Sequence, residues 1–134
     1  MESFKYVKAE DRVTGNGHTI ILERLPGIWL NTNNASRGIV KIIIAARGKG
    51  LAARAFGADD PVPRDWGEVE ADNIYAGSIS SNIAAGFSAW YRFEFSETHL
   101  QANWNQGLLV LASFTTFKDG SQRSNYFSRE FFHQ

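Results

Sequence analysis

Four arginine residues carry the side chains that are the first candidates for binding an anionic group of a ligand. Arg54 lies among small residues within Ala52–Phe56, Arg92 lies among aromatic residues, and Arg123 and Arg129 follow near the C-terminus. A guanidinium group inside an apolar cavity requires a carboxylate or an anionic ligand, because a lone buried charge is costly. Arg54 and Arg92 are therefore candidate anchors for an anionic group, while an outward position on a solvated face is the alternative for each arginine.

Tryptophan residues form the second group that could contact a ligand. Trp90 shares a face with Arg92, so it lies either in a polar lumen or on an exposed patch. Trp104 lies on a predicted core face. Trp66 follows a stiff, charged loop at residues 59–65, and it either closes the mouth of a cavity or packs on a rim. The predicted ligand-binding residues are Arg54, Trp66, Trp90, Arg92 and Trp104, with Trp66 at the mouth of a lumen and the others inside it.

Catalysis without a cofactor is the alternative to simple binding. An acid or base in a shaped cavity would suffice for an isomerisation or cyclisation of a folded ligand, and Glu94, His99 and Tyr126 are the candidates. The sequence has no phosphate-binding loop, no dinucleotide fingerprint, no zinc-protease motif and no cysteine. The remaining histidines, His18 and His133, are scattered along the chain, so neither a metal site nor a cofactor is predicted.

The elements that must position these residues are short strands. From residue 27 onward the chain alternates apolar and polar residues in segments separated by Gly, Asn, Asp and Pro. Consecutive hairpins predict antiparallel neighbours, and eight strands can close into a barrel with space for side chains or one small ligand. A two-sheet sandwich is the alternative fold. The predicted strands are 28–33, 39–47, 51–57, 67–76, 87–95, 98–105, 108–117 and 123–132, preceded by an N-terminal extension (1–26) that holds a further edge strand at 18–22.

The first strand begins with Gly27-Ile28-Trp29, and the last contains Arg129. This pair resembles the calycin group, which comprises lipocalins, fatty-acid-binding proteins and avidins. In that group a tryptophan from the first strand closes one end of the barrel and stacks with an arginine from near the C-terminus. The resemblance implies an all-β, up-and-down barrel in which Trp29 and Arg129 form a structural pair. It also implies a hydrophobic or amphipathic small molecule as the ligand, and the arginine candidates add an anionic group to the expected ligand chemistry.

The length and charge balance of the chain limit the kinds of binding partner that are expected. The 134 residues predict a single domain, and the 14 basic and 14 acidic residues give no charge excess that would favour nucleic acid or a membrane surface. The N-terminal residues carry charges without an apolar run, so no signal peptide is predicted and the cytoplasm is the expected location. The expected partner is a small molecule, with a homodimer also possible. A protein or glycan binder that uses Trp66 or Trp90 on its loops is the third hypothesis.

Overall fold

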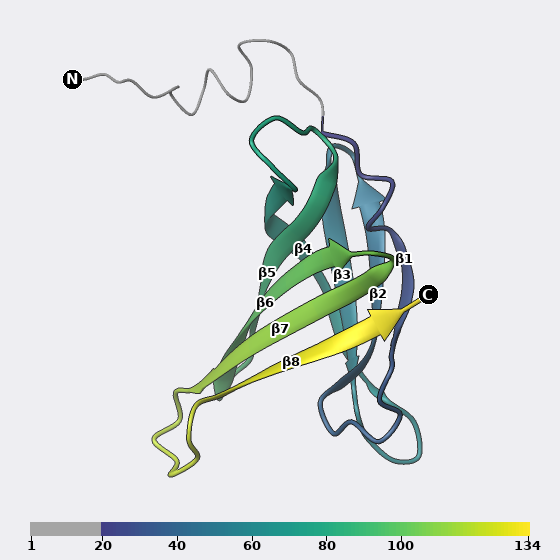
Figure 1. Cartoon of the computed structure of the whole chain (residues 1–134). Helices are drawn as coiled ribbons and strands as arrows, with labels where there is room; N and C mark the ends of the chain where they lie inside the picture. Colours follow the sequence, from purple (N-terminus) through teal and green to yellow (C-terminus); the bar gives the residue numbers. More distant parts are fainter. Residues whose placement is uncertain (1–19) are drawn as a thin grey trace, which may run out of the picture.

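The computed structural model describes residues 20–134, which form an all-β structure without a helix in that range (Figure 1). Each strand pairs in antiparallel fashion with its neighbours in the sequence, and the first strand also pairs with the last. The predicted closed barrel is thereby confirmed in preference to the two-sheet sandwich. The strands are β1 (Gly27–Asn31), β2 (Ile39–Arg47), β3 (Gly50–Gly57), β4 (Arg64–Ala76), β5 (Ala84–Arg92), β6 (Ser96–Asn105), β7 (Leu108–Phe117) and β8 (Tyr126–His133).

Two internal strands, β4 and β5, differ most from their predicted bounds. β4 begins at Arg64 and not at residue 67, because Arg64 already pairs with Gly57 of β3. β5 starts at Ala84 and ends at Arg92, so it is displaced toward the N-terminus from the predicted range 87–95. Residues 93–95 form a tight turn instead, in which the amide of Phe93 donates a hydrogen bond to the carbonyl of Ser96 at 2.8 Å.

The ends of the chain also differ from the prediction. β8 begins at Tyr126 because Arg123 belongs to the preceding loop, where its guanidinium group pairs with Asp119 at 2.6 Å. The predicted edge strand at 18–22 is reduced, within the described residues, to one isolated parallel bridge between Ile21 and Ile83. Most of the N-terminal extension lies outside the described residues. No helix that could span a membrane is found in residues 20–134.

The barrel is packed at one end, which we call the closed end. There the turns β2–β3, β4–β5 and β6–β7 lie, and Trp29 fills the interior with only 1% of its surface exposed. Its indole nitrogen donates a hydrogen bond to the carbonyl of Leu25 at 2.9 Å, so the buried N–H group has a partner that is not an arginine. The predicted role of Trp29 in closing one end is consistent with this position. Other buried side chains around it are Ile42, Ile44, Leu51, Phe87, Leu109 and Phe132.

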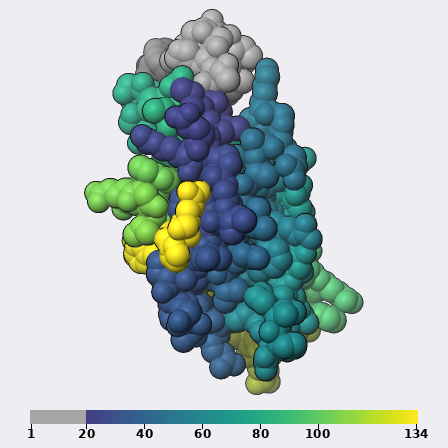
Figure 2. Space-filling view, turned by 90° about the vertical axis from the view of Figure 1, so that its right-hand side faces the viewer, coloured from purple at the N-terminus to yellow at the C-terminus, as the bar shows by residue number. Residues whose placement is uncertain are grey.

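The seam between the first and last strands is short. Leu30 pairs with His133, and Asn31 pairs with Phe132. Beyond the seam, the side chain of Gln134 donates a hydrogen bond to the carbonyl of Pro26 at 3.2 Å. Figure 2 shows the C-terminal residues lying directly against the segment that leads into β1. Gln134 therefore adds a contact between the segment after β8 and the segment before β1.

Candidate functional site

The opposite end of the barrel, which we call the mouth, contains a cavity of about 910 Å³. Two loops, at residues 32–38 and 58–63, border it, and they lie together at the bottom of Figure 1. The amide of Ala58 donates a hydrogen bond to the carbonyl of Gly38 at 2.8 Å, which joins the two loops. The barrel interior is thus divided into a packed closed end and an open, polar mouth.

Hydroxyl groups line the inner wall of the mouth. Thr98 of β6 stands directly opposite Thr115 of β7, and their hydroxyl oxygens are 2.9 Å apart. Ser113 of β7 stands opposite Ser128 of β8, with their oxygens 2.7 Å apart. A hydroxyl group has one donor and two acceptor positions, so each pair uses one donor internally and retains one O–H group. The wall can therefore donate to and accept from a polar ligand group.

A carboxylate stands beside these hydroxyls. Glu130 is half-buried on β8 opposite the buried Leu111, and its Oε1 accepts a hydrogen bond from the hydroxyl of Ser36 at 2.9 Å. Within residues 20–134 it forms no ion pair. Three arginines line this region: Arg37 and Arg64 on the loops, and Arg129 on the outward side of β8. Arg64 lies 3.9 Å from Asp59. The carboxylate is therefore placed inside the cavity and the guanidinium groups at its edge.

An aromatic wall completes the mouth. Trp66 is half-buried, and its ring packs edge-on against Tyr91 at 5.3 Å and against Phe93 at 5.5 Å between ring centroids. Its indole nitrogen lies beside Gly57, where an added Cβ atom would come within 2.7 Å of it. The absence of a side chain at Gly57 is therefore what leaves room for the Trp66 ring at the mouth.

Hydrogen bonds hold the backbone on both sides of Trp66. Asp65 accepts from the amide of Gly67 at 2.8 Å, and Arg54 donates through Nε to both carboxylate oxygens at 3.0 Å and through Nη2 to one of them. Gly67 has a φ of +89°, a conformation that glycine adopts without strain. The hydrogen bonds from Arg54 and Gly67 lower the pKa of Asp65 to about 2. Arg54 and Asp65 thus orient Trp66 from outside the barrel.

The structure places the predicted ligand-binding residues on both sides of the barrel wall. Trp66 is among the residues that line the mouth cavity. The predicted lumen position of Arg54 is wrong, because Arg54 alternates with Ala53 and Ala55, which are buried and face the interior. Since neighbouring residues of a strand point to opposite faces, the guanidinium group is directed outward.

The same reasoning corrects Trp90 and Arg92. Both alternate with the inward-facing Tyr91, so they lie on the outer surface and not in the lumen. The ring of Trp90 stacks on His99 with centroids 4.2 Å apart, and the guanidinium group of Arg92 lies 4.9 Å from the Trp90 ring. Trp104 is half-buried against the core at the closed end, with Arg24 4.5 Å from its ring.

Arg129 does not stack with Trp29. Trp29 faces the interior, whereas Arg129 lies on the exposed outer face of β8 opposite Ala112, with its guanidinium group 5.4 Å from the Phe131 ring. The pairing implied by the calycin resemblance is therefore wrong for this chain. The carbonyl of Leu25 takes the hydrogen bond of the indole instead.

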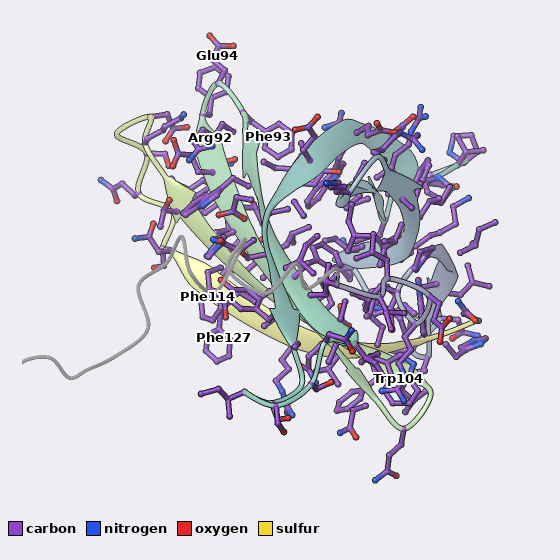
Figure 3. The ribbon with its side chains drawn as sticks, turned by 90° about the horizontal axis from the view of Figure 1, so that it is seen from above. Arg92, Phe93, Glu94, Trp104, Phe114 and Phe127 are labelled. Atoms are coloured by element: carbon purple, nitrogen blue, oxygen red, sulfur yellow. The ribbon has the colours of Figure 1, made fainter. Side chains whose placement is uncertain are left out.

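The candidate acid–base residues are not brought together. Glu94 points away from the barrel at the tip of the β5–β6 turn (Figure 3), and His99 lies on the outer face against Trp90. Tyr126 stands at the mouth, 57% exposed. Within residues 20–134 no three His, Asp or Glu side chains form a group that could hold a metal ion, and His18 lies outside that range.

Sequence reasoning missed the hydroxyl wall. In β7 the interior positions change from Leu109 and Leu111 to Ser113 and Thr115 along a single strand. The available signal was this change from large apolar to small polar residues at every second position. It marks the level at which the packed interior ends and the polar mouth begins.

Comparisons with protein-family models, with curated proteins and with solved structures gave no match.

Proposed function

We propose that this barrel binds a neutral, amphipathic small molecule in the mouth cavity. The observation that carries the proposal is the division of the interior, in which a packed closed end meets an open cavity lined by paired hydroxyls. A barrel that served only as a scaffold would gain stability from apolar packing along its whole length. Space and polar groups at a single end instead fit the usual composition of a small-molecule site.

The chemistry of the wall indicates what the ligand presents. The O–H groups retained by the Thr98–Thr115 and Ser113–Ser128 pairs suit a carbonyl, ether or hydroxyl oxygen. The Glu130 carboxylate disfavours a buried anion and accepts from an O–H or N–H group. The Trp66 ring offers an apolar surface for a flat ring system. The ligand therefore places a neutral polar group inside and an apolar ring against Trp66.

Binding of a neutral fluorescent naphthyl ketone, 6-propionyl-2-dimethylaminonaphthalene, tests the proposal directly. We expect its emission to shift to shorter wavelength on binding, with one molecule per chain. Native mass spectrometry of the full chain purified from its own source is expected to show a bound small molecule. Thr115→Val should weaken the affinity for the ketone by up to about tenfold, the effect of losing one hydrogen bond of about 1 kcal/mol.

Thr116→Val is the matched control, because Thr116 is the next residue of the same strand and is exposed on the outside. This control should bind the ketone with the affinity of the wild type. Circular dichroism of both variants checks that the barrel is intact. An unchanged emission of the ketone, together with native mass spectra of bare protein, would contradict the proposed function.

A further inference from the structure

The outer surface of β5–β8 carries a row of aromatic side chains. Trp90, His99, Phe114 and Phe127 are direct neighbours across four consecutive strands. Trp90 and His99 are stacked, and the rings of Phe114 and Phe127 are stacked at 5.8 Å. Figure 3 shows Phe114 and Phe127 projecting outward from the same side of the barrel. Phe127 remains 67% exposed, which is a large apolar surface to leave in water.

Almost no charge accompanies this row. Two further rows of outward-facing residues lie beside it on the same four strands. Arg129 is the single charged residue in these two rows, and the others are small, amide-bearing or apolar. The outward faces of β3 and β4, by contrast, carry Arg54, Glu68 and Glu70. In a chain with 21% charged residues, this face is therefore poor in charge. Arg129 lies within it, and the carboxylate of Asp72 on β4 lies at its edge, where it accepts a hydrogen bond from Ser88 at 2.8 Å. The two further rows are Ser88, Gln101, Ala112 and Arg129, and Gly86, Asn103, Val110 and Phe131.

A charged rim borders the aromatic row on the mouth side. Glu97 lies 4.0 Å from Arg92 and 3.3 Å from Lys118. Depletion of charge at the centre, enrichment of aromatic residues and arginine, and a polar rim are the features of a protein–protein interface. We call the three rows together the aromatic face.

The aromatic face also contains a hollow of about 600 Å³. The residues that line it include Tyr75, Gly86, Ser88, Ala112 and Arg129. A Cβ atom at Gly86 would lie 2.5 Å from the carbonyl oxygen of the neighbouring strand, so this position requires glycine. One face therefore holds both a hollow and a projecting phenyl ring.

We propose that a second copy of this chain covers the aromatic face, forming a two-fold symmetric dimer. In such a dimer the same surface must supply both complementary parts. Phe127 of each copy would enter the hollow of the other, and the amide oxygens of Gln101 and Asn103 would accept from Arg129 of the other copy. The barrel is closed, so two copies associate through side chains and not by joining strand edges.

The area of the aromatic face and the net charge of the chain both agree with a second copy as the partner. The aromatic face spans four strands with three outward residues each, so it measures about 19 Å by 20 Å. With a rim one residue wide around it, the area covered is roughly 800 Å² per partner, the size of a standard protein–protein interface. The chain has a formal net charge of zero, so two copies do not repel each other at long range.

Sedimentation velocity of the full chain between about 1 and about 100 micromolar tests the dimer. The expected wild-type result is a species of twice 15.0 kDa at the upper concentrations. Phe127→Glu and, separately, Phe114→Glu should each yield the monomer, because each places a charge among the aromatic rings of the buried interface. Val62→Glu is the control, since Val62 is 67% exposed on the β3–β4 loop, and it should remain dimeric.

Circular dichroism establishes that each variant is folded, and the second charged variant replaces Phe127→Glu if that one does not fold. A wild-type chain that sediments at 15.0 kDa over the whole range would overturn the proposal. Folded dimers of both charged variants would overturn it as well.

Discussion

The hydroxyl group of Tyr91 donates a hydrogen bond to the carbonyl of Gly67 at 2.6 Å, which ties β5 to the irregular start of β4. The same oxygen accepts from the amide of Ala55 at 2.9 Å. The pairing of β3 with β4 is interrupted between Arg54 and Phe56, so Tyr91 satisfies backbone groups at the interruption. This contact also fixes the backbone next to Trp66, the aromatic wall of the mouth.

Replacement of Tyr91 by phenylalanine should therefore destabilise the barrel. Tyr91→Phe leaves buried backbone groups of Ala55 and Gly67 without their partner, and we expect a loss of about 1–3 kcal/mol in the free energy of unfolding. Urea unfolding followed by circular dichroism measures it. Tyr126→Phe is the control, because Tyr126 is 57% exposed, and its effect should stay within about 0.5 kcal/mol. Equal stability of the two variants would show that the Tyr91 hydroxyl does not support the interruption.

Gly57→Ala should displace the Trp66 ring. The added methyl group would approach the indole nitrogen to 2.7 Å, and the ring is held on its other sides by Tyr91 and Phe93. We expect a changed near-ultraviolet circular dichroism spectrum and a roughly tenfold weaker affinity for the naphthyl ketone, or about 1.4 kcal/mol. Gly50→Ala is the matched control, since its Cβ atom would make an ordinary contact of 3.6 Å. A spectrum and affinity like those of the wild type would exclude a role for Gly57 in placing Trp66.

Acid should weaken the fold through Asp65. Its pKa is about 2 in the folded chain, against an ordinary value of 3.8, because Arg54 and Gly67 donate hydrogen bonds to the ionised carboxylate. A lowered pKa means that the stabilisation is complete above about pH 4 and is lost as the pH falls through about 2. We expect Asp65→Asn to reduce the dependence of Tm on pH in this window, and Arg54→Gln to reduce it in the same direction. The same slope in all three chains would contradict this linkage.

The tryptophan at the closed end should dominate the stability of the barrel. Trp29→Ala removes a fully buried indole and its hydrogen bond to Leu25, and we expect a loss of about 3–5 kcal/mol in the free energy of unfolding. Guanidinium unfolding monitored by circular dichroism gives this value. Ile28→Ala, next to it on the outer face and 56% exposed, should cost less than about 1 kcal/mol. Similar losses for the two variants would mean that Trp29 is not the main plug.

The positions of the strands followed from the sequence because they depend on local properties. Alternation of apolar and polar residues and the turn residues between segments gave the bounds of β2 and β7 without error and those of β1, β3 and β6 to within two residues. Where these local signals are weak, the observed strand bounds differ from the predicted ones. At the start of β5 the small residues Ala84 and Gly86 belong to a strand because β4 pairs with both of them and β6 also pairs with Gly86.

Which face of a strand points inward was decided by the tertiary structure. Alternation shows that Trp90 and Arg92 oppose Tyr91, but it does not say which set is enclosed. In the mouth half of β7 the interior holds Ser113, and the exterior holds Phe114, the reverse of the usual pattern.

The sequence by itself determined eight consecutive antiparallel strands, because hydrophobic period and turn chemistry act between residues close in the chain. Only the closure of the barrel brought Thr98 and Thr115, and Ser113 and Ser128, into one hydroxyl wall, because their proximity depends on the register between strands. Closure also assigned Arg54 to the outside, where it orients Trp66 through Asp65 and does not line the cavity. Which side chains point into the barrel depends on how all eight strands close together, and the sequence of one strand does not specify it.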